Sequence, residues 1–440
     1  MPVLRSEMSL TAQAAAVFAV AMAGMAPFVW GGYGSDYDNG LVIQASRMIR
    51  LYGDYFASRL PGYPLQEYVY SLLPGPAPWA YHLVTVAFSA LGAAIFFLLA
   101  KSLDAPAPAL LTTCFALLPG FFVNSFTALD YNWSLALLLA SLLACRSARP
   151  WVAGALLGLA AGVRLPNLAV GLPFLIAFSG FGRLWFAASA IAVAAAAFLP
   201  VYGAYGWSFL AIPSQPVSSP VRVIYGLGPE VWGELGALAI LWLVIATWPR
   251  LAARFKNDPF RMAAGIAVLV NLAIFARAPY EGEYLLPAAA ILLLLVGAFL
   301  SARSAIWLAG SFAFSLVVGV SKDLRPMGKL VEEMALRTAR TEYARKLAAG
   351  RSSLPPNAVI ITSIYQPLIE LELAAPVASS IVQRGRFPER WMGFQRLLMR
   401  PELDRLRASG VPVFTVKELS RGDVGGMGYD PREVGVPILR

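Results

Sequence analysis

The sequence predicts a mainly α-helical protein, a polytopic transmembrane bundle of about eleven helices followed by a small α/β domain. Two observations indicate this fold class. Of the 440 residues, 58% are hydrophobic and only 14% are charged, with a mean hydropathy of +0.64, whereas a soluble domain carries about 25% charged residues. The apolar residues also form runs that can cross a hydrocarbon core of ~30 Å at ~1.5 Å per helical residue.

The first apolar run, residues 10–30, is long enough to span a membrane, and we interpret it as a retained helix rather than a cleaved signal. The runs at 150–163 and 167–179 are short and are separated by a break at Pro166, so they are either tilted spans or a broken pair that dips in from the outer side. The other expected spans are 79–100, 106–124, 127–145, 183–202, 234–249, 261–276, 284–301 and 304–320.

The distribution of cations predicts a cytoplasmic N-terminus and a location in the cytoplasmic (inner) membrane. With this orientation, basic residues such as Arg146, Arg254 and Arg303 lie in inner turns. The short outer turns then carry only Arg164 and Arg277. Because positive residues are retained in cytoplasmic loops, the opposite orientation would invert a clear bias. The net charge of +10 therefore reflects topology, and no nucleic-acid partner is expected.

Two parts are expected: a transmembrane module at 1–321 and an extracytoplasmic α/β domain at 322–440. In the first outer loop, 31–78, apolar residues recur at helical spacing, which predicts two short amphipathic helices in the membrane interface. The elements expected in the C-terminal domain are a charged helix at 322–349, helices within 389–409, and strands at 357–362 and 411–416. No internal repeat is visible, which disfavours a symmetric transporter.

Acids and arginines gather on the expected outer side. Arginine binds phosphate through paired hydrogen bonds, and a carboxylate can take a proton from a hydroxyl, so the set suits a substrate with a charged headgroup and a lipid tail. Each residue also has a structural explanation, as a helix cap, an interfacial charge or part of an aromatic belt. The candidates are Asp36, Asp38, Arg59, Tyr63, Asp130, Arg164, Arg277, Glu281, Glu283 and Tyr284.

Several familiar motifs are absent from the sequence. It contains no Walker A motif, no dinucleotide-binding glycine fingerprint after a strand, no HExxH and no Cys/His cluster. Cys114 and Cys145 are expected at different depths, which disfavours a disulfide, and the single histidine, His82, cannot build a histidine metal site. Because nucleotide sugars are cytosolic and the candidate residues face outward, a glycosyl donor would have to be lipid-linked.

Short motifs over residues 10–320 carry a family resemblance by their order and spacing. They are the first-loop acids Asp36 and Asp38, Ala45–Ile49, Tyr52–Tyr55, Ser58–Pro64, Leu129–Asp130, the small-residue segment Ala153–Arg164, and Tyr284–Pro287. Together they resemble the GT-C superfamily of membrane glycosyltransferases, in particular the protein O-mannosyltransferases and the aminoarabinose transferases that act on lipid A. Two features differ from many relatives: Asp130 stands alone where they carry an acidic pair, and the C-terminal part is shorter.

The resemblance implies an integral membrane glycosyltransferase that moves a sugar from a polyprenyl-phosphate donor to a glycan, lipid or protein acceptor on the extracytoplasmic face, with inversion. A first-loop acid would be the catalytic base or would help to bind a metal. Both Asp36 and Asp38 fit that position, and we expect Asp36 as the base with Asp38 as its partner. A divalent cation, Mg²⁺ or Mn²⁺, would be held by Asp36, Asp38 and Asp130.

The remaining candidates are expected to bind substrate, and an arginine such as Arg59, Arg164 or Arg277 would neutralise the lipid phosphate. Two other functions stay open: a flippase or transporter of lipid-linked sugars, and a non-catalytic assembly subunit with the same fold. Near-absence of charge inside the expected spans weighs against transport. The sequence specifies neither the sugar nor the acceptor.

Overall fold

The structure is a computed structural model that describes residues 8–73, 75, 77–210, 220–279, 281–320, 325–362, 365–372, 400–417, 424 and 427–439, without the side chains of Gln366 and Glu370. The chain forms two compact units that alternate along the sequence. The first comprises Met1–Val29, His82–Leu199 and Pro213–Glu333, and the second comprises Trp30–Tyr81, Pro200–Ile212 and Met334–Arg440. The division into 1–321 and 322–440 stays a prediction.

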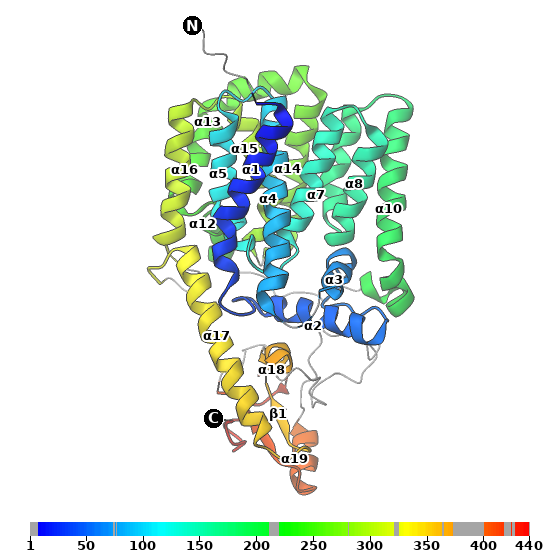
Figure 1. The fold of residues 1–440 in the computed structure, drawn as a ribbon, viewed down its shortest axis with the longest axis vertical. Helices are drawn as coiled ribbons and strands as arrows, with labels where there is room; N and C mark the ends of the chain where they lie inside the picture. The colour runs from blue at the N-terminus through cyan, green and yellow to red at the C-terminus, as the bar shows by residue number, and fades with distance from the viewer. Residues whose placement is uncertain are drawn as a thin grey trace. The chain divides into compact units, whose positions relative to one another are not determined.

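The first unit is a helical bundle (Figure 1). Each segment predicted to span the membrane is helical over most of its length, and α7 packs against α8, α5 against α16 and α14 against α15. The elements are α1 (Leu10–Met25), η1 (Ala26–Val29), α4 (Pro78–Ser102), α5 (Pro108–Leu117), α6 (Pro119–Asn124), α7 (Tyr131–Arg146), α8 (Pro150–Val163), α9 (Asn167–Gly171), η2 (Leu172–Ala177), α10 (Phe181–Tyr205), α11 (Pro220–Leu227), α12 (Pro229–Trp232), α13 (Glu234–Asn257), α14 (Pro259–Arg277), η4 (Gly282–Leu285), α15 (Leu286–Gly297) and α16 (Ala302–Val317).

Within the described residues, five helical segments are long and apolar enough to cross a membrane, and further apolar helices are shorter. The chain is therefore a mainly helical membrane protein, as predicted. Proline at or next to the first helical position begins many of these helices, where its fixed φ suits the helix and its missing N–H is not needed. At α14, Asp258 also caps the helix by accepting a hydrogen bond from the Phe260 N–H at 3.0 Å.

Two glycines of α8 allow this helix to approach α10 at backbone distance. A Cβ atom at Gly154 would lie 2.1 Å from the Phe186 carbonyl oxygen, and one at Gly158 would lie 2.7 Å from the Ala190 carbonyl oxygen. No real side chain tolerates such contacts, so the small-residue segment is a packing surface. It fixes the course of α8 up to Val163, after which Arg164 continues in extended backbone before the Pro166 break.

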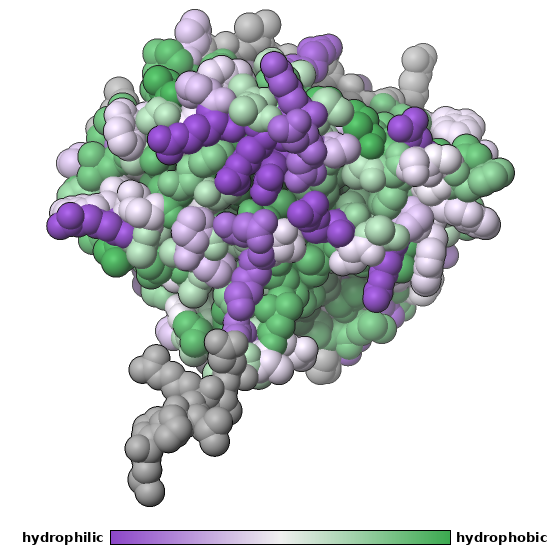
Figure 2. Space-filling model, turned by 90° about the horizontal axis from the view of Figure 1, so that it is seen from above, coloured by the Kyte–Doolittle hydropathy of each residue, from purple (hydrophilic) through white to green (hydrophobic). Residues whose placement is uncertain are grey.

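Lys101, Arg146 and Arg261, all predicted for inner turns, lie at the end of the bundle where α1 begins, and Lys101 donates to Gln13 of α1 at 2.7 Å. Figure 2 views this end and shows hydrophilic residues gathered over it, with apolar surface around them. Arg146 at the end of α7 donates to the Ser102 carbonyl at 3.3 Å and lies 3.8 Å from the Asp258 carboxylate. The guanidinium of Arg261 donates to the Leu103 carbonyl at 3.2 Å. These contacts join the ends of neighbouring helices, and the cytoplasmic location of this end stays a prediction.

The second unit contains the first loop and the C-terminal part. Its elements are α2 (Tyr37–Tyr52), α3 (Pro64–Ser71), η3 (Gly206–Leu210), α17 (Lys329–Ser352, which begins in the first unit), β1 (Val359–Ile361), α18 (Gln366–Glu372), α19 (Arg400–Ala408) and β2 (Val413–Thr415). β1 and β2 pair in parallel, with Val359 opposite Val413, around a small core that includes Leu403 and Met427. Both predicted strands are confirmed in shortened form, and residues 389–399 of the predicted helical region lie outside the described residues.

The predicted amphipathic helices of the first loop are α2 and α3, which pack against each other. Helix α2 buries Val42, Ile43 and Ala45, whereas Leu51 is 61% exposed at its end and Leu72 is 80% exposed just after α3. Helix α18 approaches α2 at Gly40, where a Cβ atom would already lie 3.0 Å from a Leu368 methyl group. The first loop is therefore a folded platform, and its place in the membrane interface stays a prediction.

Candidate active site

Asp36 and Asp38, the two first-loop acids, stand in different environments although one residue separates them. Asp36 caps α2: its backbone is extended (φ −86°, ψ 139°), and its Oδ1 accepts a hydrogen bond from the Asp38 N–H at 2.7 Å. Its side chain is half-buried, and among the described residues no cation pairs with it. The structural explanation of Asp36 as a helix cap is correct, and the cap uses one of its two carboxylate oxygens.

Asp38 forms an ion pair instead. Its Oδ2 lies 3.1 Å from Nε of Arg59, and the two side chains are 24% and 16% exposed. The same Nε lies 3.1 Å from the Tyr63 hydroxyl, and the guanidinium carbon lies 4.2 Å from the centre of the Tyr63 ring. The structure thus brings together Asp36, Asp38, Arg59 and Tyr63, all from the first loop, and distinguishes a cation-paired acid from an acid without a cation.

Arg59 lies in the turn that leads into α3. This turn is closed by a hydrogen bond from the Gly62 N–H to the Arg59 carbonyl at 2.7 Å. Gly62 has φ +96°, and a Cβ atom there would lie 2.6 Å from the Tyr55 hydroxyl oxygen, so both conformation and space require glycine. The turn therefore has a defined shape that places Arg59 against Asp38.

Glu67 is a supporting acid of the same outer loop to which the sequence alone assigns no role in the site. Its fully buried carboxylate accepts hydrogen bonds from the Ser58 N–H at 2.7 Å, from the Tyr63 N–H at 3.2 Å and from the Tyr55 hydroxyl. Burial raises the pKa of Glu67 above its usual value, and the hydrogen bonds from Ser58, Tyr55 and Tyr63 oppose that rise only in part. The available signal was the i, i+4 spacing of Tyr63 and Glu67 at the start of α3.

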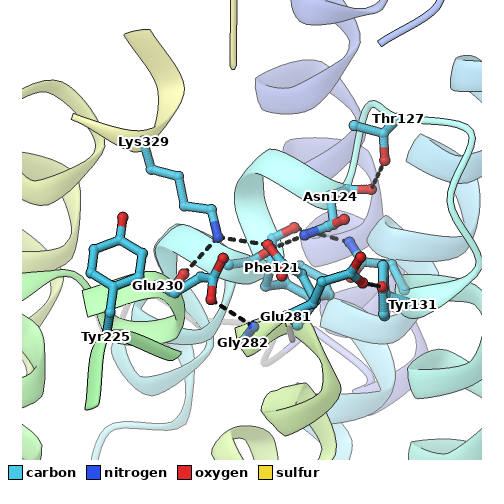
Figure 3. Close-up of polar contacts among 12 residues, drawn as sticks. Phe121, Asn124, Thr127, Tyr131, Tyr225, Glu230, Glu281, Gly282 and Lys329 are labelled. Atoms are coloured by element: carbon cyan, nitrogen blue, oxygen red, sulfur yellow. Dashed lines mark hydrogen bonds and ion pairs between the residues drawn. The ribbon is translucent and has the colours of Figure 1, made fainter. Parts of the chain in front are cut away.

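A second group of predicted residues lies in the first unit. Arg164, just after α8, donates to Oδ2 of the fully buried Asp130 at 2.6 Å, and its guanidinium carbon lies 4.2 Å and 4.9 Å from the ring centres of Tyr131 and Tyr284. The Tyr131 hydroxyl donates to Glu281, as Figure 3 shows. The structure therefore brings Asp130, Arg164, Glu281 and Tyr284 together from the start of α7, the end of α8 and η4.

Glu283, the other predicted acid next to Gly282, pairs with Lys329. Its Oε1 lies 2.7 Å from Nζ of Lys329, which also donates to the Glu230 carbonyl at 2.6 Å. The Glu230 carboxylate accepts from the Gly282 N–H at 2.7 Å (Figure 3). It also lies 3.0 Å from Arg222. Burial and the neighbouring Glu283 raise the pKa of Glu230. For Lys329, burial lowers the pKa, but Glu283 and Glu230 outweigh that effect and the pKa is raised.

Arg277 is not gathered with either group. It is exposed at the end of α14, and within the described residues no acid pairs with it. The two cysteines, Cys114 and Cys145, are buried and free, so the expectation of no disulfide is correct.

The described residues do not provide a donor set for the predicted divalent cation. Among them, no group of three or more His, Cys, Asp or Glu side chains lies close enough to hold a metal ion. Asp38 and Asp130 each pair with an arginine. Magnesium favours carboxylates free to enter octahedral geometry, which these two are not. No step below therefore uses a metal.

No protein-family model matches the chain, and no curated protein matches its sequence. Solved structures do match. The crystal structure of ArnT from Cupriavidus metallidurans bound to undecaprenyl phosphate has a TM-score of 0.54 at 16% identity, over 83% of this chain and 84% of that chain. ArnT from the same organism in the apo state has a TM-score of 0.50 at 16% identity, over 98% of this chain and 88% of that chain. The Archaeoglobus fulgidus oligosaccharyltransferase in complex with zinc and sulfate has a TM-score of 0.45 at 14% identity, over 84% and 62%.

Proposed function

From the premise that this chain has the fold of the GT-C superfamily of membrane glycosyltransferases, we propose that it moves a sugar from a polyprenyl-phosphate donor to an acceptor hydroxyl. The reaction takes place at the extracytoplasmic face of the cytoplasmic membrane. The donor class is proposed because ArnT, which shares the fold, was crystallised with undecaprenyl phosphate. The acceptor is a glycan, a lipid or a protein.

The observation that carries the proposal is the contrast between Asp36 and Asp38. A general base needs a carboxylate oxygen that no cation neutralises and that an acceptor can reach. Asp36 is half-buried and fixed through Oδ1, and its Oδ2 has no partner among the described residues. Asp38 is instead paired with Arg59 at 3.1 Å. The loop therefore offers a base and, beside it, a positioned cation.

The proposed chemistry is a single displacement at the anomeric carbon. The acceptor oxygen attacks this carbon while the bond to the phosphate oxygen breaks, and the electron pair leaves with the lipid phosphate. The acceptor proton passes to Asp36. Arg59, which Asp38 and Tyr63 orient, neutralises the charge that grows on the leaving phosphate. In-line attack inverts the anomeric configuration, and the phosphate leaves without needing a strong acid.

The other candidate arginines divide by their contacts. Arg164 pairs with buried Asp130 and lies over two tyrosine rings, so we assign it to joining the ends of α7 and α8 rather than to binding phosphate. Arg277 is exposed and has no acidic partner among the described residues, so it is the second candidate for the lipid phosphate. Glu281 and Tyr284 stay candidates for contacts with the sugar.

Transfer by purified protein tests the proposal, with a panel of synthetic polyprenyl-phosphate sugars as donors. Asp36→Asn should reduce the rate about 10²- to 10⁴-fold, the usual loss when a positioned base is removed. Asp54→Asn, an exposed acid of the same loop, is the matched control and should stay within about threefold of wild type.

Full activity of the Asp36→Asn protein would refute the base assignment. Movement of the lipid-linked sugar across vesicle membranes without formation of a new glycosidic bond would instead support a flippase.

A further inference from the structure

The first loop contains a buried carboxylate whose hydrogen bonds reach both ends of the turn that carries Arg59. Glu67 accepts from the Ser58 N–H, one residue before Arg59, and from the Tyr63 N–H, whose residue begins the entry into α3. The turn between these two contacts is closed at Arg59 and Gly62. Glu67 therefore bridges the base of the turn, while the Arg59 side chain reaches out from it to Asp38 and Tyr63.

We propose that Glu67 is a positioning residue for the transfer reaction: it shapes the turn from Ser58 to Tyr63 and thereby sets where the Arg59 guanidinium lies relative to Asp38. This inference rests on the proposed function, because it gives Arg59 its task. It assigns no chemical step to Glu67. The carboxylate has no exposed surface, and its lone pairs face Ser58, Tyr63 and Tyr55, so it has no access to substrate.

The chemistry of the turn explains why a carboxylate is needed. Both Ser58 and Tyr63 present backbone N–H groups, which an acceptor alone can satisfy in a buried place. A carboxylate has acceptor sites on both oxygens, one for each end of the turn. Glutamine has the same shape but replaces one oxygen with an NH₂ donor, so Glu67→Gln sets a donor against one of the two N–H groups. The turn must then open by shifting that end.

The shift at Tyr63 or Ser58 moves Arg59. The Tyr63 ring and hydroxyl contact the guanidinium directly, at 4.2 Å and 3.1 Å, and Ser58 precedes Arg59 in the chain. Misplacement of a binding group by about 1 Å costs up to about 10²-fold in rate. We therefore expect Glu67→Gln to reduce kcat/KM about 10- to 100-fold, most of it in kcat because charge on the leaving phosphate grows in the transition state.

A double-mutant cycle separates positioning from mere folding. Glu67→Gln and Arg59→Ala are made singly and together, and transfer is measured per folded protein. If Glu67 acts through Arg59, Glu67→Gln reduces the rate about 10- to 100-fold in the parent and less than about threefold in the Arg59→Ala background. Equal losses in both backgrounds would overturn the proposal. Should Glu67→Gln not be recovered folded, Glu67→Asp, which keeps the charge one methylene further back, enters the same cycle.

Tyr55→Phe is the matched control. It removes a donor from the same carboxylate but leaves the contacts to Ser58 and Tyr63, so it should lower the rate less than about threefold. A loss as large as that of Glu67→Gln would assign the effect to packing around Tyr55 and would refute the role of the turn.

Binding of a synthetic polyprenyl phosphate distinguishes failure of the proposed transfer function from failure of the positioning role of Glu67. If wild-type protein binds the lipid phosphate but transfers no sugar, the proposed function fails and the cycle is measured on affinity instead. Glu67→Gln should then weaken binding about tenfold with Arg59 present and leave it unchanged in the Arg59→Ala background. Equal weakening in both would refute the positioning role on this second readout.

Discussion

Lys329 is predicted to stabilise the first unit, and Lys329→Met is the perturbation that measures this contribution. The ammonium group joins α17 to η4 and α12 through Glu283 at 2.7 Å and the Glu230 carbonyl at 2.6 Å. The Lys329 and Glu283 side chains are only 18% and 13% exposed. Removing one member of a buried pair leaves the other charge without compensation and costs about 3–5 kcal/mol. Because some solvent reaches both groups, we expect about 3 kcal/mol.

The assay is denaturant-induced unfolding of the purified variant in detergent, with the wild-type protein measured in parallel. Lys346→Met is the matched control, because Lys346 is an exposed lysine of the same helix, α17. It should change the free energy of unfolding by less than about 0.5 kcal/mol. Adding Glu283→Gln to Lys329→Met should restore part of the loss, because it removes the uncompensated carboxylate. Equal stability of the Lys329→Met and Lys346→Met proteins would refute the reasoning.

The difference in unfolding free energy between wild type and Lys329→Met should depend on pH with a defined sign. The pKa of Lys329 is raised in the folded protein, so its contribution is fully present below the ordinary lysine pKa and is lost as pH rises through the raised value. The stability gap between wild type and Lys329→Met should therefore be constant at neutral pH and should shrink only in strongly alkaline solution. A gap that shrinks near neutral pH would contradict the raised pKa.

Two further predictions concern the α8 region. Gly158→Leu should lower the free energy of unfolding by at least about 1–3 kcal/mol and reduce folded yield, because a Cβ atom there already lies 2.7 Å from the Ala190 carbonyl oxygen. Gly24→Ala is the control and should cause no such loss, because a Cβ atom there has nothing within 4 Å. Thermal unfolding in detergent compares the two variants. Arg164→Met should destabilise the protein by about 3–5 kcal/mol, because it removes the cation that pairs with buried Asp130. Adding Asp130→Asn should recover part of this loss, and no recovery would contradict the pairing.

The helices could be predicted because their signals are local. An apolar run of sufficient length predicts a span whatever surrounds it, and Pro166 marks the end of one helix and the start of the next. The strands were predicted from runs of β-branched residues such as Val359, Ile360 and Ile361. Their parallel pairing was not, because register depends on contacts between segments far apart in the chain.

The partners of the site residues could not be predicted for the same reason. Arg164 lies 34 residues from Asp130, Lys329 lies 46 residues from Glu283, and Tyr131 lies 150 residues from Glu281. Residue types indicated that these acids and bases share one side, but not which acid meets which base. The role of Lys329 could not be predicted because the residue begins a charged helix, where a lysine is usually solvated.

The contacts now distinguish the two first-loop acids, which sequence spacing left equivalent. Among the predicted acids, Asp38 pairs with Arg59, Asp130 with Arg164 and Glu283 with Lys329, and Glu281 accepts from Tyr131. The carboxylate of Asp36 alone in this set has no cation or side-chain donor within the described residues, and its contact is the cap at the start of α2. A helix cap fixes a carboxylate without neutralising it. We therefore keep Asp36 as the proposed proton acceptor, with Asp38 proposed to orient the arginine beside it.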